Sequence, residues 1–273
     1  STRSGPTSRG VQRGVQFAGV HRPPGTVLRV FPLKDNIPTR HFPVVTVVLI
    51  ALNVITYLFL QPKTGIDFSG NSLDPGKIYD YAATPCSISG SCGAGVPADS
   101  TPWLNVLTSM FSHAGLLHLG GNMLFLWIFG NNIEDSMGRV RYVAFYLLGG
   151  VAAFGLQFAL ETGSEIPTLG ASGAVAAVLG GYLLLYPRAR VVTAIFIVLF
   201  FTLIEIPAFL VLGFWFLQQV AFGALDLTNP TGGGGGGVAY FAHIGGFVFG
   251  LALIKLFATH RNEAADAPRL PVY

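Results

Sequence analysis

Six apolar segments, each long enough to cross a lipid bilayer, constrain this 273-residue chain more than any other feature. A transmembrane helix needs about 17–25 mostly apolar residues. Only 11% of the residues are charged, against roughly 25% in a soluble protein. The sequence therefore predicts an all-α polytopic membrane protein with a six-helix transmembrane bundle. The predicted spans lie at 43–60, 115–131, 141–160, 169–186, 205–225 and 238–258.

The apolar stretch 191–225 is too long for one span. Its 35 residues would extend ~52 Å as a single helix, well beyond the ~30 Å hydrocarbon core. Glu205 and Pro207 interrupt it. We expect residues 191–203 to lie along or dip into the membrane interface, and the fifth span to begin near Glu205.

Lys and Arg residues gather on one side of the predicted spans. Such residues favour the cytoplasmic loops of membrane proteins. Of the sixteen, only Lys63 and Lys77 fall in the loops assigned to the other side. Both termini are therefore expected to face the cytoplasm, with the protein in the plasma membrane. The formal charge of +3 follows this bias and does not indicate a nucleic-acid partner.

These patterns divide the chain into three regions. Residues 1–33 are expected to be a basic, disordered cytoplasmic extension, residues 34–260 the membrane domain, and residues 261–273 a short cytoplasmic tail. The first 30 residues hold five arginines and lack the apolar run of about 7–15 residues that a cleavable signal peptide needs.

Two loops on the other side of the spans have unusual compositions. The loop 61–101 carries Cys86 and Cys92, an isolated pair that lacks the four ligands of a zinc site, so no metal is expected. A local disulfide in an extracytoplasmic loop and two unrelated thiols both fit this pair. The glycine run 232–237 fits either a passive spacer or a mobile cover over a site.

Polar side chains inside membrane spans are costly, so each one needs a reason. Some of these side chains stand alone on their predicted helices. They are Asn53, Gln157 and the adjacent pair Gln218 and Gln219. Interhelical hydrogen bonds account for them.

Four other polar residues share one depth. Ser172 and His243 lie about 6–10 Å inside the outer ends of the fourth and sixth predicted spans, at 1.5 Å of rise per residue. His118 and Asn122 occupy the first turns of the second span, and their i, i+4 spacing places them on one helix face. These four side chains should converge in one outer layer.

Glycines flank both Ser172 and His243. Gly170, Gly173 and Gly246 are small enough to let transmembrane backbones touch, so the two spans can bring the serine and the histidine within hydrogen-bond reach. Taken alone, such glycines are as well explained by helix packing.

The residue types in this layer suit acyl transfer. A serine hydroxyl becomes a nucleophile when a base takes its proton, and His243 is positioned to be that base. Because no Asp or Glu lies at this depth, a Ser-His dyad is expected. His118, Asn122 and the backbone N–H of Ser172 could donate hydrogen bonds to the developing oxyanion.

The chain resembles the rhomboid family of intramembrane serine proteases. The resemblance rests on HAGLLHLGGN (113–122), EDSMG (134–138), GASG (170–173) and AHIGGFVFG (242–250). It implies that Ser172 is the nucleophile, His243 the general base, and His118 and Asn122 the oxyanion hole. It also implies that Gly246 allows close packing, and that Glu134 and Gly138 close the cytoplasmic end of the second span. Ala176 stands where many rhomboids carry an aromatic ring.

The resemblance implies an intramembrane serine endopeptidase, without a metal or organic cofactor, that cleaves single-span transmembrane proteins near their extracytoplasmic end. The alternative is a catalytically silent rhomboid-like protein that binds transmembrane clients. A channel or transporter would need polar groups through the full depth of the bilayer, whereas those of the predicted site occupy one layer.

Overall fold

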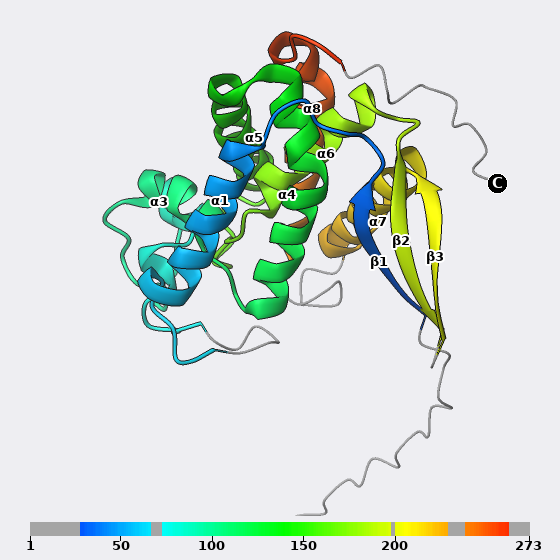
Figure 1. Cartoon of the computed structure of the whole chain (residues 1–273). Coiled ribbons are helices and arrows are strands. Elements are labelled where there is room, and N and C mark those ends of the chain that lie inside the picture. Colours follow the sequence, from blue (N-terminus) through cyan, green and yellow to red (C-terminus); the bar gives the residue numbers. More distant parts are fainter. Residues whose placement is uncertain (1–27, 67–72, 198–199, 229–237, 262–273) are drawn as a thin grey trace, which may run out of the picture.

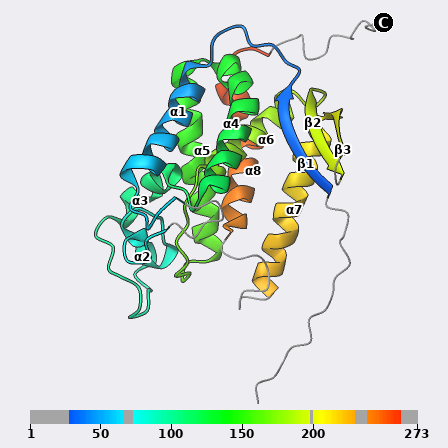
Figure 2. The same ribbon diagram turned by 60° about the horizontal axis from the view of Figure 1, so that its bottom comes forward.

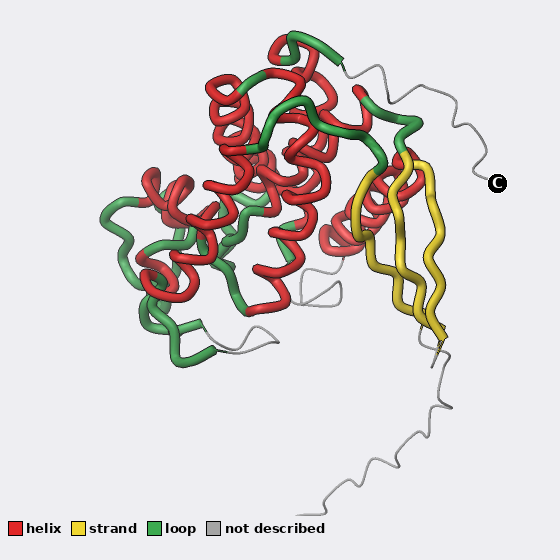
Figure 3. The backbone as a smooth tube through the Cα atoms, in the orientation of Figure 1, coloured by secondary structure: helices red, strands yellow, loops and turns green. Residues whose placement is uncertain are grey.

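The computed structural model describes residues 28–66, 73–197, 200–228 and 238–261. It shows a helical bundle with a small β-sheet beside it (Figures 1 and 3). The glycine run 232–237, residues 1–27 and residues 262–273 lie outside the described part. The helices are α1 Val44–Ile55, extended by a π-helical turn Thr56–Leu60, α2 Pro85–Ser89, α3 Pro102–Thr108, α4 Leu116–Met137, α5 Arg139–Leu160, α6 Ser172–Leu185, α7 Ala208–Thr228 and α8 Tyr240–Phe257.

A helix occurs at each of the six predicted spans, but six membrane crossings are not confirmed. Within the described residues, α5, α7 and α8 are long and apolar enough to cross a bilayer. Helix α6 and the segment Val44–Leu60 are apolar but shorter. The second half of α4 carries Glu134 and Asp135, both buried inside the protein.

The predicted all-α fold is wrong at residues 191–197 and 200–203, which belong to β-strands; their place along the membrane interface stays a prediction. Strands β2 Arg190–Ile197 and β3 Phe200–Pro207 form an antiparallel hairpin, and β1 Leu28–Asp35 pairs with the other edge of β2. β-branched and aromatic residues dominate β2 and β3, and such residues favour strands over helix. An all-α fold was therefore too simple, and the helix after the hairpin begins at Ala208 rather than near Glu205.

The sheet stands to one side of the bundle, next to α7 (Figures 1 and 2). Leu28 of β1 pairs with Ile197 of β2, and Arg190 of β2 pairs with Pro207 of β3. Strand β1 starts inside the segment predicted as an N-terminal extension.

Helix α6 lies at the centre of the bundle and packs directly on α8. A Cβ atom added at Gly250 would lie 2.0 Å from the carbonyl oxygen of Ala177, and one at Gly180 would lie 2.1 Å from that of Phe247. The two backbones are therefore in contact along both helices, and this is what glycine permits in a membrane bundle.

One carboxylate ties α1 to α4 at the end of the bundle remote from Ser172. The Glu134 side chain accepts hydrogen bonds from the backbone N–H of Val45 (2.9 Å), the N–H of Thr46 (2.8 Å) and the Thr46 hydroxyl (2.8 Å). It thereby satisfies N–H groups that the first turn of a helix leaves unpaired. The chain then turns from α4 into α5 at Gly138, whose φ is +78°.

Residues 73–115, between α1 and α4, are folded onto the bundle (Figure 1). Cys86 and Cys92 are joined by a disulfide bond, which settles the question that the sequence left open. Ala83 and Thr168 exchange two backbone hydrogen bonds of 2.9 and 2.8 Å. This pairing holds the chain just before α6 in place.

Candidate active site

Ser172 is the first residue of α6, and the backbone before it is held on both sides. Thr168 pairs with Ala83, and the N–H of Gly170 donates to the carbonyl of Ser109 at 2.9 Å. The φ of Gly170 is +125°, a backbone conformation that residues with a Cβ atom rarely adopt. These bonds therefore fix the position of Ser172 at the start of α6.

The backbone of Gly170 lies between the His118 ring and Ser172. A Cβ atom at this position would lie 2.8 Å from both Cε1 and Nε2 of His118 and 3.6 Å from Oγ of Ser172. Only glycine leaves room for the His118 ring this close to the serine.

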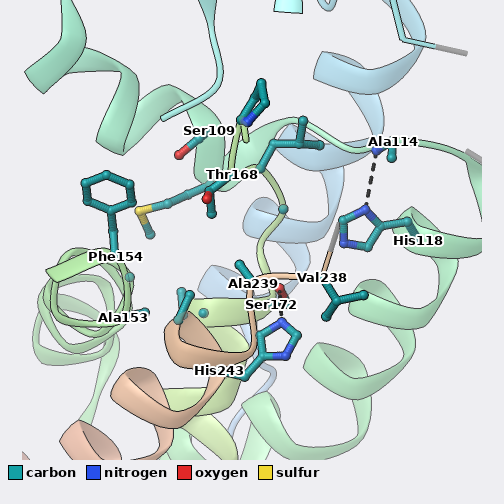
Figure 4. Close-up of a pocket in the computed structure, with 18 of the residues that line it drawn as sticks. Ser109, Ala114, His118, Ala153, Phe154, Thr168, Ser172, Val238, Ala239 and His243 are labelled. Atoms are coloured by element: carbon teal, nitrogen blue, oxygen red, sulfur yellow. Dashed lines mark hydrogen bonds between the residues drawn. The ribbon is translucent and has the colours of Figure 1, made fainter. Parts of the chain in front are cut away.

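His243 reaches Ser172 from α8. Its Nε2 lies 2.7 Å from the Ser172 Oγ, a hydrogen-bond distance, and Figure 4 shows this bond as a dashed line. The approach depends on Gly246, where a Cβ would lie 2.0 Å from the carbonyl oxygen of Gly173. Gly173 in turn packs on Ala153, since its own added Cβ would lie 2.6 Å from that methyl group.

The structure brings three of the four predicted polar residues together. His118 accepts a hydrogen bond at Nδ1 from the N–H of Ala114 (3.3 Å), which leaves Nε2 of the neutral ring to carry the proton. Asn122 lies one turn further along α4, where its amide donates to the carbonyl of His118 at 2.9 Å. Asn122 is buried and does not line the cavity beside Ser172.

A cavity of about 530 Å³ opens beside these side chains. Ser172, His118 and His243 supply polar groups, and apolar atoms of Ala153, Phe154 and neighbouring residues form much of its wall (Figure 4). A mostly apolar hollow with a few convergent polar groups is the usual form of a ligand site. Within the described residues, no cluster of His, Cys, Asp and Glu is suited to hold a metal ion.

Two residues of α7 that contact His243 were not predicted as site residues. The Gln219 Oε1 lies 2.8 Å from Nδ1 of His243, and the Trp215 ring lies with its centroid 5.7 Å from that of the imidazole. Gln219 does form an interhelical hydrogen bond, as expected, but its partner is the histidine of the site. Two features of the sequence could have marked Gln219 as a site residue: its depth along α7 and the aromatic residue one turn earlier.

Two further residues form hydrogen bonds with the backbone next to His243 and Ser172. Gln157 of α5 accepts a hydrogen bond from the N–H of Ala242 at 3.1 Å, the interhelical role expected for it. His113, three residues before α4 begins, is fully buried, and its Nε2 accepts a hydrogen bond of 3.5 Å from the backbone N–H of Ala171. Burial, together with His118 nearby, lowers the pKa of His113 to about 3, so this ring is neutral at physiological pH.

Comparison with known proteins identifies the family. A model described as the rhomboid domain matches residues 100–260. The chain is 32% identical to the mitochondrial rhomboid protein 1 of Saccharomyces cerevisiae over 175 residues, 62% of this chain and 45% of that protein. It is 31% identical to the human mitochondrial presenilin-associated rhomboid-like protein over 181 residues, 64% of this chain and 42% of that protein.

A bacterial relative carries the name of an enzyme. The chain is 28% identical to the rhomboid protease GluP of Bacillus subtilis over 141 residues, 52% of this chain and 24% of that protein. The chain thus spans less than half the length of these three relatives. Because the domain match covers more than half of the chain, and includes Ser172, His243 and His118, this membrane protein belongs to the rhomboid family.

Proposed function

We propose that this protein is an intramembrane serine endopeptidase that uses a Ser172–His243 dyad. The observation that carries the proposal is the 2.7 Å contact between Ser172 Oγ and His243 Nε2, at the wall of a cavity in a rhomboid domain. A nucleophile within hydrogen-bond reach of a base is the arrangement that covalent acyl transfer requires. The relative named as a protease supports the same assignment.

The proposed reaction has two halves. In the first, Nε2 of His243 takes the proton of Ser172 while Oγ attacks the carbonyl carbon of the scissile peptide bond. The C–N bond then breaks, the departing amine takes the proton from Nε2, and an acyl-enzyme remains. In the second half, a water molecule loses a proton to Nε2, attacks the acyl carbon, and releases Ser172 with its proton restored.

Charge that develops on the carbonyl oxygen needs hydrogen-bond donors. The His118 ring lies across Gly170 from Ser172, and its Nε2 carries the proton in the tautomer that the Ala114 contact selects. The backbone N–H of Ser172 and the amide of Asn122 are the other proposed donors. Asn122 would act through a second amide hydrogen or after leaving the His118 carbonyl.

The proposed substrates are single-span membrane proteins, cleaved near their extracytoplasmic end. An extended peptide has unpaired backbone groups that a nucleophile can reach, whereas a helix satisfies its own, so substrates with helix-breaking and small residues near the cut should be favoured. The proposal includes a plasma-membrane location, cytoplasmic termini and no metal or organic cofactor. The positive charges of Arg139 at the start of α5, Arg188 in the turn after α6 and Lys255 in the last turn of α8 lie far from the end of the bundle that holds Ser172, and this supports the orientation.

The test uses the full chain in proteoliposomes with a single-span reporter substrate. The wild-type protein should release the reporter ectodomain and react with a fluorophosphonate, whereas Ser172→Ala and His243→Ala should do neither. Ser100→Ala is the matched control, because Ser100 is an exposed serine of the loop before α3, and it should behave as wild type.

Two outcomes would overturn the proposal. Cleavage that survives in Ser172→Ala would assign the reaction to another group. A wild-type protein that retains the reporter without cutting it, and that the fluorophosphonate does not label, would indicate the silent client-binding protein instead.

A further inference from the structure

Helix α7 buries one narrow face, and that face contains a single polar residue. The buried residues of α7 are Ala208, Leu212, Gln219 and Gly223, spaced by four, seven and four positions. This spacing returns to the same side of a helix. A Cβ atom added at Gly223 would lie 3.1 Å from the Phe241 ring and 3.4 Å from Tyr240, so this side faces α8. Placing an amide there is costly unless its hydrogen bonds are made.

Both ends of the Gln219 amide have partners. Its Oε1 lies 2.8 Å from His243 Nδ1, and its Nε2 donates to the carbonyl of Trp215 at 3.4 Å. A carbonyl cannot donate, so the bond to Trp215 assigns the nitrogen end of the amide and leaves Oε1 facing the imidazole. An oxygen facing Nδ1 must accept a hydrogen from it.

This contact selects one of the two neutral tautomers of His243. With its hydrogen on Nδ1, the ring keeps the lone pair of Nε2 for Ser172, 2.7 Å away. In the opposite tautomer, Nε2–H would point at the serine and the ring could not take its proton. Which imidazole nitrogen carries the proton is generally set by the bond that the other nitrogen makes.

Trp215 restrains the same ring by contact. Its indole centroid lies 5.7 Å from that of His243, with 36° between the planes, and it also packs on Phe247 one turn further along α8. Helix α7 thus offers His243 a hydrogen-bond acceptor at its edge and an aromatic ring at its side, from residues one helical turn apart.

We propose that Gln219 is a positioning residue of this site, which fixes the tautomer and the orientation of His243 with Trp215 packed beside the ring. This inference rests on the proposed dyad and adds to it. In place of the carboxylate of a Ser-His-Asp triad, a neutral amide on a neighbouring helix would orient the base. The base is then competent only while α7 stays packed on α8.

The kinetic test compares Gln219→Ala, Gln219→Glu and Gln218→Ala in proteoliposomes with the reporter substrate. Gln218 is the matched control, since it has the same side chain and neighbours Gln219 but is exposed. We expect Gln219→Ala to lower kcat by roughly 10- to 100-fold with little change in KM. That loss is smaller than the ~10⁴-fold loss seen when the orienting carboxylate of a serine-protease triad is replaced. Gln218→Ala should match wild type.

Gln219→Glu separates positioning from packing. A glutamate keeps an acceptor facing Nδ1, so activity should return to within several-fold of wild type. Its charge favours the protonated imidazole, so the pH at which activity falls to half on the acid side should rise. His118, the other titratable side chain lining the cavity, is unchanged in all variants. If Glu is as inactive as Ala while both fold, Gln219 does not act as an acceptor.

The tautomer itself can be measured without catalysis. In ¹⁵N NMR of histidine-labelled protein, with the His243 signals assigned by their loss in His243→Gln, wild type should show Nδ1 protonated and Nε2 unprotonated. Gln219→Ala should show a mixture. A wild-type ring protonated at Nε2 would overturn the inference.

The two proposals fail in different ways. If Ser172→Ala is inactive but Gln219→Ala cleaves like wild type, the positioning role is wrong and the dyad stands. If wild type does not cleave the reporter at all, the proposed function is wrong, and the NMR measurement still decides whether Gln219 orients His243.

Discussion

Asn122 is the residue whose observed contact differs most from its proposed role. Its amide is held by the carbonyl of His118, within its own helix, and it does not line the cavity beside Ser172. A donor that acts on a transition state does not need to be aligned before substrate binds, because catalytic hydrogen bonds often tighten only in the complex. The kinetics of an Asn122 variant therefore test its role as a donor.

We predict that Asn122→Ala lowers kcat on the reporter by about 10²-fold, the usual result of losing one oxyanion donor. Its thermal unfolding temperature in detergent should change little, because the lost side-chain bond is to a carbonyl that a helix already pairs. Rates and unfolding of purified protein check both parts. Full activity of a folded Asn122→Ala protein would reduce Asn122 to a packing residue.

At the scale of elements, the contact between α6 and α8 sets the distance between Ser172 and His243. A Cβ at Gly246 would lie 2.0 Å from the Gly173 carbonyl oxygen, and that oxygen belongs to a helix backbone that cannot turn aside. Gly246→Ala must therefore push the two helices apart at the level of the dyad.

We predict that Gly246→Ala lowers kcat/KM by at least about 10²-fold, the scale of loss that a ~1 Å misplacement of reacting groups causes. Its unfolding temperature should also fall. Gly155→Ala on α5 is the control, because nothing lies within 4 Å of its added Cβ. Equal effects of the two substitutions on rate would show that the α6–α8 distance does not control the chemistry.

At the scale of the whole molecule, Asp35 connects the sheet to the bundle. Its Oδ2 accepts hydrogen bonds of 2.6 Å from the Tyr182 hydroxyl on α6 and of 2.6 Å from the Asn132 amide on α4. The residue ends β1, so these bonds tie the N-terminal strand to two helices of the core. Burial raises the pKa of the Asp35 carboxyl from 3.8 to about 6, although the bond from Tyr182 acts in the other direction.

This raised pKa predicts a pH-dependent stability. The folded protein binds the Asp35 proton more tightly than the unfolded chain does, so the contribution to stability is full below pH ~3.8 and is lost as pH rises through ~6. Wild type should therefore gain stability relative to Asp35→Asn as pH falls from about 7 to about 4.5. Thermal unfolding of both proteins across this range measures the difference, and a constant difference would contradict the assignment.

The sequence by itself determined the membrane class and singled out Ser172, His243 and His118, which the structure brings together. The apolar runs predicted the positions of the six long helices, because a helix that crosses a bilayer needs about 17–25 mostly apolar residues. The depth of Ser172, His243 and His118 along their helices was also readable, since a helix rises by a constant 1.5 Å per residue. The glycines that allow α6 and α8 to touch could also be identified from the sequence, because they flank Ser172 and His243.

Contacts between segments far apart in the chain were decided by the tertiary structure alone. Residues 191–197 are apolar enough to suit an interface, and they form the middle strand of a sheet because β3 pairs with one edge and β1, more than 150 residues earlier, with the other. Gln219 was one of several lone polar residues until the packing of α7 on α8 placed it 2.8 Å from His243. A side chain's partner depends on how helices pack, and a sequence read one segment at a time does not contain that information.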